Sequence, residues 1–548
     1  MLENSVQVKN EQLSDLHEVE ELRALVRQQA ETIAELAKHN QELSKRIREL
    51  EEELRAKKKL NKKPQLSASK LNQGKQLELK QRKGKRPGSA KRSKKDSFVV
   101  DTEWKIEPSQ LPVGAKFNGY REYDVQELRI ERNNIRFLLA EYVLPGGGVI
   151  SAQLPPQYQN TGHYGPQLVG YILHQYYHNR VTQPLIHEQL LEWGIEISVG
   201  QINSILSAKI DVFHTEQASV LGAGLECSEY VHTDDTGARH SGKNGYCTVI
   251  GNEWFTFFAS TPQKTRRNFL SVLQGNAPIY VLNQDAHQYL ASYKLADKHM
   301  NRLSFGSTVL GNSPEQWQDY LDSIGIVQTK VAQRVTEAAL LGGLIESGIN
   351  RKLLILSDGA RQFNILIHGL CWVHAERIIR KLEGSTAEFR NNIEEVQSLL
   401  WEYYQQLKAY QDHPSADQQE YLSARFDEIF GRCYLHHPTL SNALNQFRQN
   451  KEQLLRVLDK PNIPLHNNAA ESDIREFVTR RKISGGTRSE AGLQARDTMI
   501  GLKKTCRKLG ICFWAYLLSR LRGDDKIPPL PDLIRQKAIE HRLVGSPA

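Results

Sequence analysis

The chain has 548 residues, of which 39% are hydrophobic and 25% charged, and its formal net charge is +9. This length predicts several domains of about 100–200 residues each. No apolar run approaches the ~20 residues of a membrane span, and we expect no signal peptide because the start of the chain is polar and acidic. The six cysteines are too few and too scattered for a disulfide framework or a four-cysteine zinc site. A reduced, cytoplasmic protein is therefore expected.

A heptad pattern over residues 22–54 predicts a coiled coil within residues 14–56. The d positions are mostly Leu, and the a positions are mostly β-branched with one asparagine: Val26, Ile33, Asn40, Ile47 and Leu54. This combination favours a parallel two-stranded coiled coil in which the buried Asn sets the register. We therefore predict a homodimer held by Val26, Ile33, Asn40 and Ile47.

The net charge is concentrated in one short segment. Residues 55–95 carry seventeen Lys or Arg and one acidic side chain, whereas residues 1–54 carry seven basic and thirteen acidic ones. A basic segment attached to a near-neutral body is typical of a polyanion-binding arm, and a solubilising linker is the alternative. Because large apolar residues are rare there, residues 57–97 are expected to form a flexible basic linker.

Two small modules are expected next along the chain. Residues 98–160 are expected to be β-rich, because apolar and polar residues partly alternate in Val125–Glu141 and Pro145–Gly148 forms a turn. Residues 161–222 are expected to be helical, with Ser198 as the N-cap of a short helix. The last two short helices resemble a DNA-binding helix-turn-helix, and a plain helical hairpin is the alternative.

From residue 223 onward strands alternate with helices, and three carboxylates occupy informative places. Asp234 follows the expected strand Tyr230–Thr233, Asp358 follows the buried run Leu353–Leu356, and Glu471 lies in the first turns of an expected helix. Carboxylates at the ends of adjacent strands, with another on a crossing helix, can converge on one point. Their oxygens suit Mg²⁺ or Mn²⁺, and a pair of such ions supports displacement at phosphorus.

Two of these assignments have rivals. Asp235 is adjacent to Asp234, and composition does not decide between them. Asp285 follows the apolar run Ile279–Leu282 and competes with Asp358. The local pattern favours Asp358, because its preceding run is cleaner and Gly359 allows close approach of a ligand.

Several stretches share a more specific pattern. They are Val231–Gly237, Ser357–Gly359, Cys371–His374 with Arg377, and Ile463–Glu471 with Arg475. Together they resemble the bacterial insertion-sequence transposases of the family numbered sixty-six. The resemblance implies an α/β fold with an RNase H-like mixed sheet core and helical insertions. It also implies an Asp-Asp-Glu triad of Asp234, Asp358 and Glu471, chosen over Asp235 and Asp285, with Mg²⁺ or Mn²⁺ as cofactor.

The resemblance also divides the chain. It implies a first part of the core over residues 223–380, a helical insertion over 381–462, a final part of the core over 463–525 and a C-terminal tail over 526–548. Many family members carry a cysteine zinc-binding module upstream of the core. The first cysteine here is Cys227, so residues 98–160 would keep the strands of that module without its metal.

Residues around the triad have two readings each. Cys371 and His374 stand one helical turn apart, but two ligands make no closed zinc site, so with Arg377 they are assigned a structural or substrate-positioning role. Arg475 either forms an i,i+4 ion pair with Glu471 or contacts DNA. The DNA-binding set is the basic run of this helix: Arg475, Arg480, Arg481 and Lys482.

The leading hypothesis is a DNA transposase that cleaves element ends and joins their 3′ hydroxyls to target DNA by two-metal-ion phosphoryl transfer. An RNase H-like nuclease without strand transfer and a catalytically inactive DNA-binding dimer are the alternatives. The expected partners are the element ends, target DNA and accessory proteins encoded by the same element, with no membrane partner. The expected location is the nucleoid within the cytoplasm.

Overall fold

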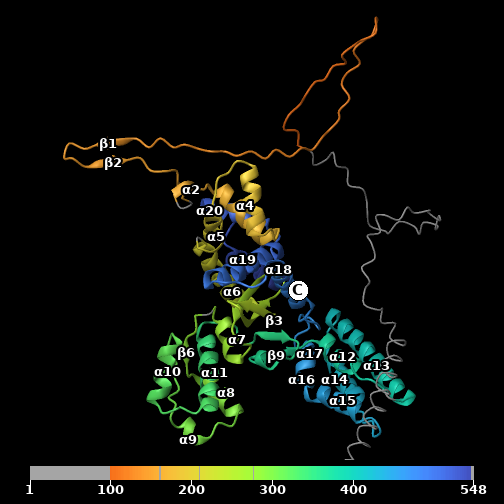
Figure 1. The fold of residues 1–548 in the computed structure, drawn as a ribbon. Helices are drawn as coiled ribbons and strands as arrows, with labels where there is room; N and C mark the ends of the chain where they lie inside the picture. Colours follow the sequence, from red (N-terminus) through yellow and green to blue (C-terminus); the bar gives the residue numbers. More distant parts are fainter. Residues whose placement is uncertain (1–98, 160–161, 209, 276, 385, 545–548) are drawn as a thin grey trace, which may run out of the picture. The chain divides into compact units, whose positions relative to one another are not determined.

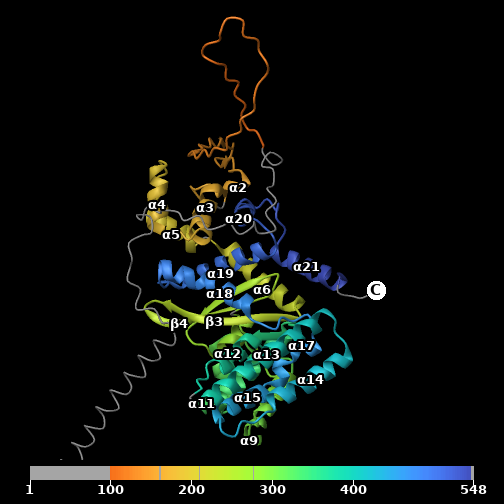
Figure 2. The same cartoon turned by 90° about the vertical axis from the view of Figure 1, so that its right-hand side faces the viewer.

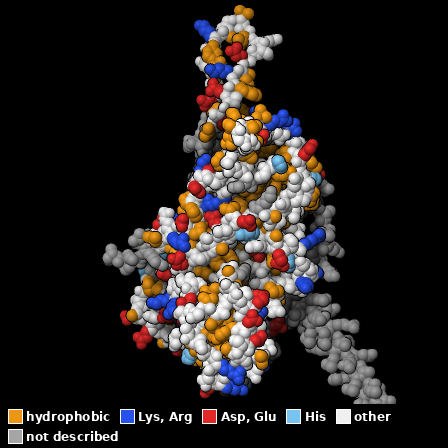
Figure 3. All heavy atoms as spheres, turned by 90° about the vertical axis from the view of Figure 1, so that its left-hand side faces the viewer, with side chains coloured by type: hydrophobic (Ala, Val, Ile, Leu, Met, Phe, Trp, Pro, Cys, Tyr) orange, Lys and Arg blue, Asp and Glu red, His pale blue; other side chains and the backbone are white. Residues whose placement is uncertain are grey.

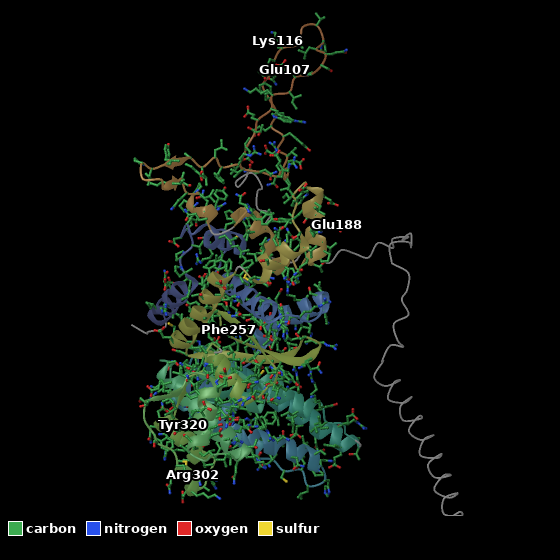
Figure 4. All side chains as sticks on the ribbon, turned by 60° about the vertical axis from the view of Figure 1, so that its left-hand side comes forward. Glu107, Lys116, Glu188, Phe257, Arg302 and Tyr320 are labelled. Carbon is green, nitrogen blue, oxygen red and sulfur yellow. The ribbon has the colours of Figure 1, made fainter. Side chains whose placement is uncertain are left out.

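The structure is a computed structural model, and it describes residues 99–544 except 160–161, 209, 276 and 385. The predicted coiled coil, its residues Val26, Ile33, Asn40 and Ile47, and the predicted basic linker lie outside the described residues. The chain divides into two compact units, residues 1–125 and 126–548. The described part of the first unit, residues 99–125, contains no helix or strand, and Glu107 and Lys116 mark it in Figure 4.

The second unit begins with a small hairpin of β1 (Glu141–Val143) and β2 (Val149–Ser151). Residues 126–140 form no strand, so the β-rich module expected over 98–160 is reduced, within the described residues, to this hairpin. Both of its strands are exposed along their whole length. A strand is stabilised mainly by a buried face, which this region of the chain does not have.

Helices connect the hairpin to the central sheet. They are α2 (Pro156–Gln159), α3 (Pro166–Leu173), the π-helix η3 (His174–His178), α4 (Gln183–Glu192), α5 (Val199–Ser207) and α6 (Asp211–Cys227). Ser198 caps α5 in a reciprocal capping box with Gln201, as its position before the helix predicts. Gly194 ends the turn after α4 with a φ of 69°.

Within the described residues the central sheet is mixed and has five strands, in the order β5-β4-β3-β8-β9 (Figure 1). The strands are β3 (Tyr230–His240), β4 (Lys243–Gly251), β5 (Thr256–Thr261), β8 (Leu354–Ser357) and β9 (Ile367–Leu370). β3, β4 and β5 pair antiparallel, whereas β3, β8 and β9 pair in parallel. All four residues of β8 are buried, as expected of a strand in the parallel part of a sheet.

β3 is longer than the sequence predicts. The expected strand ends at Thr233, but the pairing with β4 continues to His240 and places Asp234 inside the strand. The turn that follows is Ser241-Gly242, and both residues have positive φ, which suits a tight hairpin between twisted strands. The polar run after Thr233 is therefore a paired strand, and the expectation that the strand ends at Thr233 is wrong.

Two groups of elements are inserted around the parallel strands. Between β5 and β8 lie α7 (Arg266–Leu273), β6 (Tyr280–Val281), α8 (Gln284–Ser292), α9 (Asp297–Met300), β7 (Val309–Gly311), α10 (Pro314–Ser323) and α11 (Thr329–Glu346). β8 and β9 are joined by the 3₁₀ turn η4 (Arg361–Phe363). After β9 come α12 (Trp372–Arg380), α13 (Ala387–Asp412), α14 (Ala416–Phe430), α15 (Pro438–Gln449), α16 (Lys451–Leu454) and α17 (Arg456–Asp459).

The last helices return to the sheet. They are α18 (Asn468–Ser484), α19 (Glu490–Lys508), α20 (Phe513–Arg522) and α21 (Leu530–Val544). α18 packs on β3 and β4 through Ile474 and Phe477, and α19 lies beside it (Figure 2). None of the described helices is long and apolar enough to cross a membrane.

The segment predicted to be a C-terminal tail, residues 526–548, is largely the helix α21. It packs on α6, and its residues Leu530, Ile534 and Ala538 are buried. Their spacing of four places them on one helical stripe, which is why the segment folds against the body of the second unit.

Replacing Ile534 with Ala is expected to destabilise the second unit by about 2–5 kcal/mol, because the side chain is fully buried and its loss leaves a cavity. Urea unfolding followed by circular dichroism measures the loss. Ile539→Ala is the matched control on the same helix, where the side chain is 58% exposed. Equal effects of the two substitutions would contradict the packing described for α21.

Candidate active site

The parallel pairing of β3 with β8 brings two aspartates to one place. Val231 pairs with Ile355 and His232 with Leu356, so the same register continued by two residues sets Asp234 opposite Asp358. Alternate residues of a strand point to the same face, so Asp234 shares the face of His232. That face is covered by α18, because His232 contacts Asp473 of this helix at 3.5 Å.

The start of α18 is fastened to β3 beside Asp234, which places Glu471 at the same site. The side chain of Asn467 is fully buried and donates a 2.8 Å hydrogen bond to the carbonyl of Thr233. The backbone N–H of Asn467 donates to the sulfur of Cys371 at 3.2 Å. One residue therefore joins the first turn of α18 both to the strand that carries Asp234 and to the start of α12.

The three carboxylates interact electrostatically. Burial raises the pKa of Asp234 to about 6, and the negative charges of Asp358, Asp235 and Glu471 contribute to the rise. A buried carboxyl group among other carboxylates, which is hard to ionise, is typical of a site that binds a cation.

Asp235 differs from Asp234 in its surroundings. Its carboxylate accepts a 2.6 Å hydrogen bond from Gln362 and lies 3.5 Å from the ammonium of Lys264. Burial raises the pKa of Asp235, and Lys264 and Gln362 oppose that rise. Its charge is therefore balanced by protein groups, whereas Asp234 has mostly carboxylates around it.

Asp285, the other rival, lies in α8. The strand before it, β6, pairs with β7 in a separate two-stranded sheet. The Asp285 carboxylate contacts Arg351 at 3.2 Å. Its position after an apolar run therefore does not place it on the central sheet.

Arg377 of α12 holds the carboxylate of Glu471 and also donates to the ring of His374 beside it. Each lies 3.4 Å from Glu471 Oε1, and the Arg377 guanidinium is 2.8 Å from His374 Nε2. Burial lowers the pKa of His374, and the charge of Arg377 lowers it further. Cys371 contacts the start of α18 rather than these two side chains. The three residues predicted as one motif therefore lie in two contacts, Cys371 with the backbone of Asn467 and His374 and Arg377 beside Glu471.

Asp234, Asp358 and Glu471 suit a divalent cation by their chemistry. All three offer hard oxygen donors, and burial, with a further contribution from the neighbouring carboxylates, raises the pKa of Asp234. Within the described ranges, however, no three His, Cys, Asp or Glu side chains lie close enough together to enclose an ion as they stand. The Glu471 carboxylate would have to leave Arg377 and His374 to complete such a site.

The basic residues predicted to contact DNA lie in two different environments. Arg475 and Lys482 are exposed on α18. Arg481 is half-buried, and its guanidinium lies against β3, 3.4 Å from the position that a Cβ atom at residue 237 would occupy. These three side chains are on the surface that continues from the carboxylates toward the end of α18.

Arg480 is buried, with only 3% of its surface exposed. Its guanidinium lies over the rings of Tyr176 and Tyr177, 4.0 Å and 5.0 Å from their centres, and it donates to the carbonyl of Tyr176. It therefore fastens α18 to η3 and is not free to reach a phosphate, unlike its neighbours in the sequence.

A buried ionic cluster around Asp473 of α18 was not predicted from the sequence. Asp473, two residues after Glu471, accepts hydrogen bonds from Lys508 at 2.6 Å and from Thr256 at 3.0 Å. Burial alone would raise the pKa of Asp473, but the contacts with His232 and Lys508 hold the pKa well below its usual range. Burial lowers the pKa of His232 to about 4, so this ring is neutral at pH 7. No local pattern in the sequence signals this cluster, because Thr256 and Lys508 lie far from Asp473 along the chain.

The helical hairpin of α4 and α5 is poorly suited to DNA. Neither helix contains Lys or Arg, and Glu188, Glu192 and Glu196 are exposed on or next to them; Glu188 is labelled on α4 in Figure 4. Negative charge on this face opposes contact with phosphates. The charge of α4 and α5 therefore favours a plain helical hairpin over a DNA-binding helix-turn-helix.

Two comparisons with known proteins bear on this site. Residues 341–495, which include Asp358, Cys371–His374 and Glu471, match the family described as the Transposase IS66 family. The uncharacterized protein y4jO of Sinorhizobium fredii is 41% identical over 331 residues, which cover 58% of this chain and 100% of that protein. The chain belongs to the IS66 family of transposases.

Proposed function

We propose that the protein is a DNA transposase whose active site is Asp234, Asp358 and Glu471. The observation that carries the proposal is the convergence of these carboxylates from two parallel strands and one fastened helix, with the pKa of Asp234 raised to about 6. The family match, which includes two of the three residues, supports it.

The sheet supports an RNase H-like core. Numbered along the chain, its strands have the order 3-2-1-4-5, with the first three antiparallel and the last two parallel to the first. The first proposed catalytic residue lies on the central strand, and the second follows the neighbouring parallel strand. The elements between β5 and β8 and the helices α13 to α17 are insertions into this arrangement.

In the proposed reaction the chain's own residues bind, orient and balance charge. Asp234, Asp358 and Glu471 would hold Mg²⁺ or Mn²⁺, and a pair of such ions supplies Lewis-acid activation of the attacking oxygen and stabilisation of the leaving oxygen. Asn467 positions Glu471, and Arg377 holds its carboxylate in the ion-free chain. Arg475, Arg481 and Lys482 would contact DNA phosphates beside the carboxylates.

Asp234→Asn, Asp358→Asn and Glu471→Gln are each expected to reduce cleavage and strand transfer by orders of magnitude, because each removes a ligand charge while keeping the side chain's size. A labelled element end in Mg²⁺ or Mn²⁺ measures both steps. Joined donor and target strands distinguish a transposase from a nuclease without strand transfer.

Asp285→Asn is the matched control, because its carboxylate contacts Arg351 in another part of the chain. It should retain most activity. Full activity in any of the three triad variants, with folding verified by circular dichroism, would show that the carboxylates are assigned wrongly.

Asp234→Asn is also expected to stabilise the ion-free protein at pH 7.5 by on the order of 2 kcal/mol, because a raised carboxyl pKa means that ionisation opposes folding. The folded pKa of about 6 lies above the ordinary value of 3.8, so the penalty is full above about pH 6 and absent below about pH 4. Wild type and variant should therefore unfold at the same urea concentration at pH 3.5. A stability difference that is independent of pH would contradict the electrostatic coupling.

Arg481→Gln and Lys482→Gln should weaken binding to specific and random duplexes alike. Each lost phosphate contact lowers the slope of log affinity against log salt by about 0.9. Fluorescence anisotropy over a salt series measures this slope. Lys537→Gln, an exposed lysine on α21 paired with Glu540, is the control and should leave the slope unchanged. Unchanged slopes in both α18 variants would place the DNA elsewhere.

A further inference from the structure

Residues 358–363, which we call the Asp358 loop, leave the sheet directly after a buried strand. All four residues of β8 are buried, whereas Asp358 and Gly359 are exposed. The N–H of Ala360 donates to Asp358 Oδ1 at 3.0 Å and forms a local turn, in which Gly359 has a φ of 98°. This turn fixes the carboxylate relative to the loop but not relative to β3. The position of Asp358 therefore depends on what holds the loop.

The pairing between β3 and β8 stops before the two aspartates. Its last pair is His232 with Leu356, two residues short of each aspartate. The carbonyl of Thr233 accepts a hydrogen bond from Asn467 and so does not continue the ladder. Two carboxylates side by side repel each other. Without a further contact, the exposed loop would be free to move its carboxylate away from Asp234.

Asp235 supplies such a contact from the next position of β3. Its carboxylate accepts a 2.6 Å hydrogen bond from the side chain of Gln362, which belongs to the Asp358 loop. Lys264 lies 3.5 Å from the same carboxylate and balances its charge, and the Asp235 side chain is only 11% exposed. A hydrogen bond to an ionised and largely buried carboxylate is stronger than one at the surface. Successive residues of a strand point to opposite faces, so Asp235 leaves Asp234 free to face α18.

Two further contacts hold the Asp358 loop from the side of α7. Arg266 donates a 2.6 Å hydrogen bond to the carbonyl of Arg361. Phe363 is buried, and its ring centre lies 4.9 Å from that of Phe269. These contacts fasten the loop to α7, and the hydrogen bond of Gln362 ties it to β3. The loop is therefore held between the helix and the strand that carries the first aspartate.

We propose that Asp235 is a positioning residue of the metal site: through Gln362 it holds Asp358 at the distance from the first aspartate that the strand register sets. The proposal rests on the proposed function, because it concerns the same carboxylates. Asp234 offers its oxygens to the cation, whereas Asp235 uses its own to hold Gln362. Acidic and basic side chains are mixed over the described part of the face drawn in Figure 3, so individual contacts, and not a broad area of one charge there, have to set the geometry.

The first test titrates Mn²⁺ into the full chain and into its Gln362→Met variant, with the electron paramagnetic resonance signal of free Mn²⁺ as the readout. The substitution keeps the side chain's length and the net charge, so a change in affinity reports geometry. The dissociation constant of Gln362→Met is expected to be at least about tenfold higher, as for other groups that orient metal ligands. Gln263→Met is the matched control, because Gln263 is an exposed glutamine next to Lys264, and it should bind Mn²⁺ like the wild type.

Hydrogen exchange in the ion-free chain supplies a readout that needs no metal. The amides of Ala360 and Phe363 donate hydrogen bonds within the Asp358 loop, so they should exchange faster in Gln362→Met while the amides of β8 stay protected. Asp235→Ala should have the same effect, and the two substitutions together should add nothing further, because each removes the same contact. Asp235→Asn keeps an oxygen that accepts from Gln362 and should restore slow exchange.

Equal Mn²⁺ affinity in wild type and Gln362→Met, or equal exchange in the loop, would overturn the positioning role. A loss of Mn²⁺ binding in Asp235→Asn as complete as that in Asp234→Asn would show that Asp235 is a ligand, and would also overturn it. Absence of Mn²⁺ binding in the wild type would instead overturn the proposed metal site, and the positioning role with it. The two failures are distinguishable, because the wild type binds the ion in one and not in the other.

Discussion

In the central sheet β3 pairs in parallel with β8, and every other feature of the site is arranged around this pairing. The register sets His232 beside Leu356 and, two residues on, Asp234 beside Asp358. Ile355 packs in one hydrophobic core and Leu354 and Leu356 in another, so a slip of β8 by one position would exchange side chains between two packed faces. The separation of the two aspartates is thus fixed by the hydrophobic core and not by the carboxylates themselves, which repel each other.

The third carboxylate is positioned by different means. Asn467 and Asp473 flank Glu471 in the sequence, and both are buried against β3 or its neighbours. Asn467 donates to the Thr233 carbonyl, and Asp473 contacts His232 and Lys508. A buried ion pair that loses one partner leaves an uncompensated charge, which is strongly unfavourable. The first turns of α18 are therefore held from two sides, which fixes the backbone of Glu471 between them.

The parts of this arrangement that could be predicted are the local ones. The run before Asp358 is apolar and bounded by Gly359, and the turns around Ser198 and Gly194 have strong capping signals, so these elements follow from short stretches of sequence. β3 beyond Thr233 could not be predicted in this way, because its polar residues are ordered by pairing with β4. The burial of Arg480 depends on Tyr176, about 300 residues upstream, and the partner of Asp473 is Lys508 on another helix. Local patterns carry no information about such contacts.

The charges of α18 serve the helix and the proposed function together. Glu471 stands in its first turn and Arg481 and Lys482 in its last, which is the favourable order for a helix dipole. Eleven residues separate Glu471 from Lys482, so the helix spans roughly 16 Å between them. Phosphates of one DNA strand rise about 3.4 Å each along the duplex axis, so this distance corresponds to about five nucleotides. A strand bound along α18 would thus contact Arg481 and Lys482 several nucleotides from Glu471, so these two side chains do not compete with divalent ions for its carboxylate.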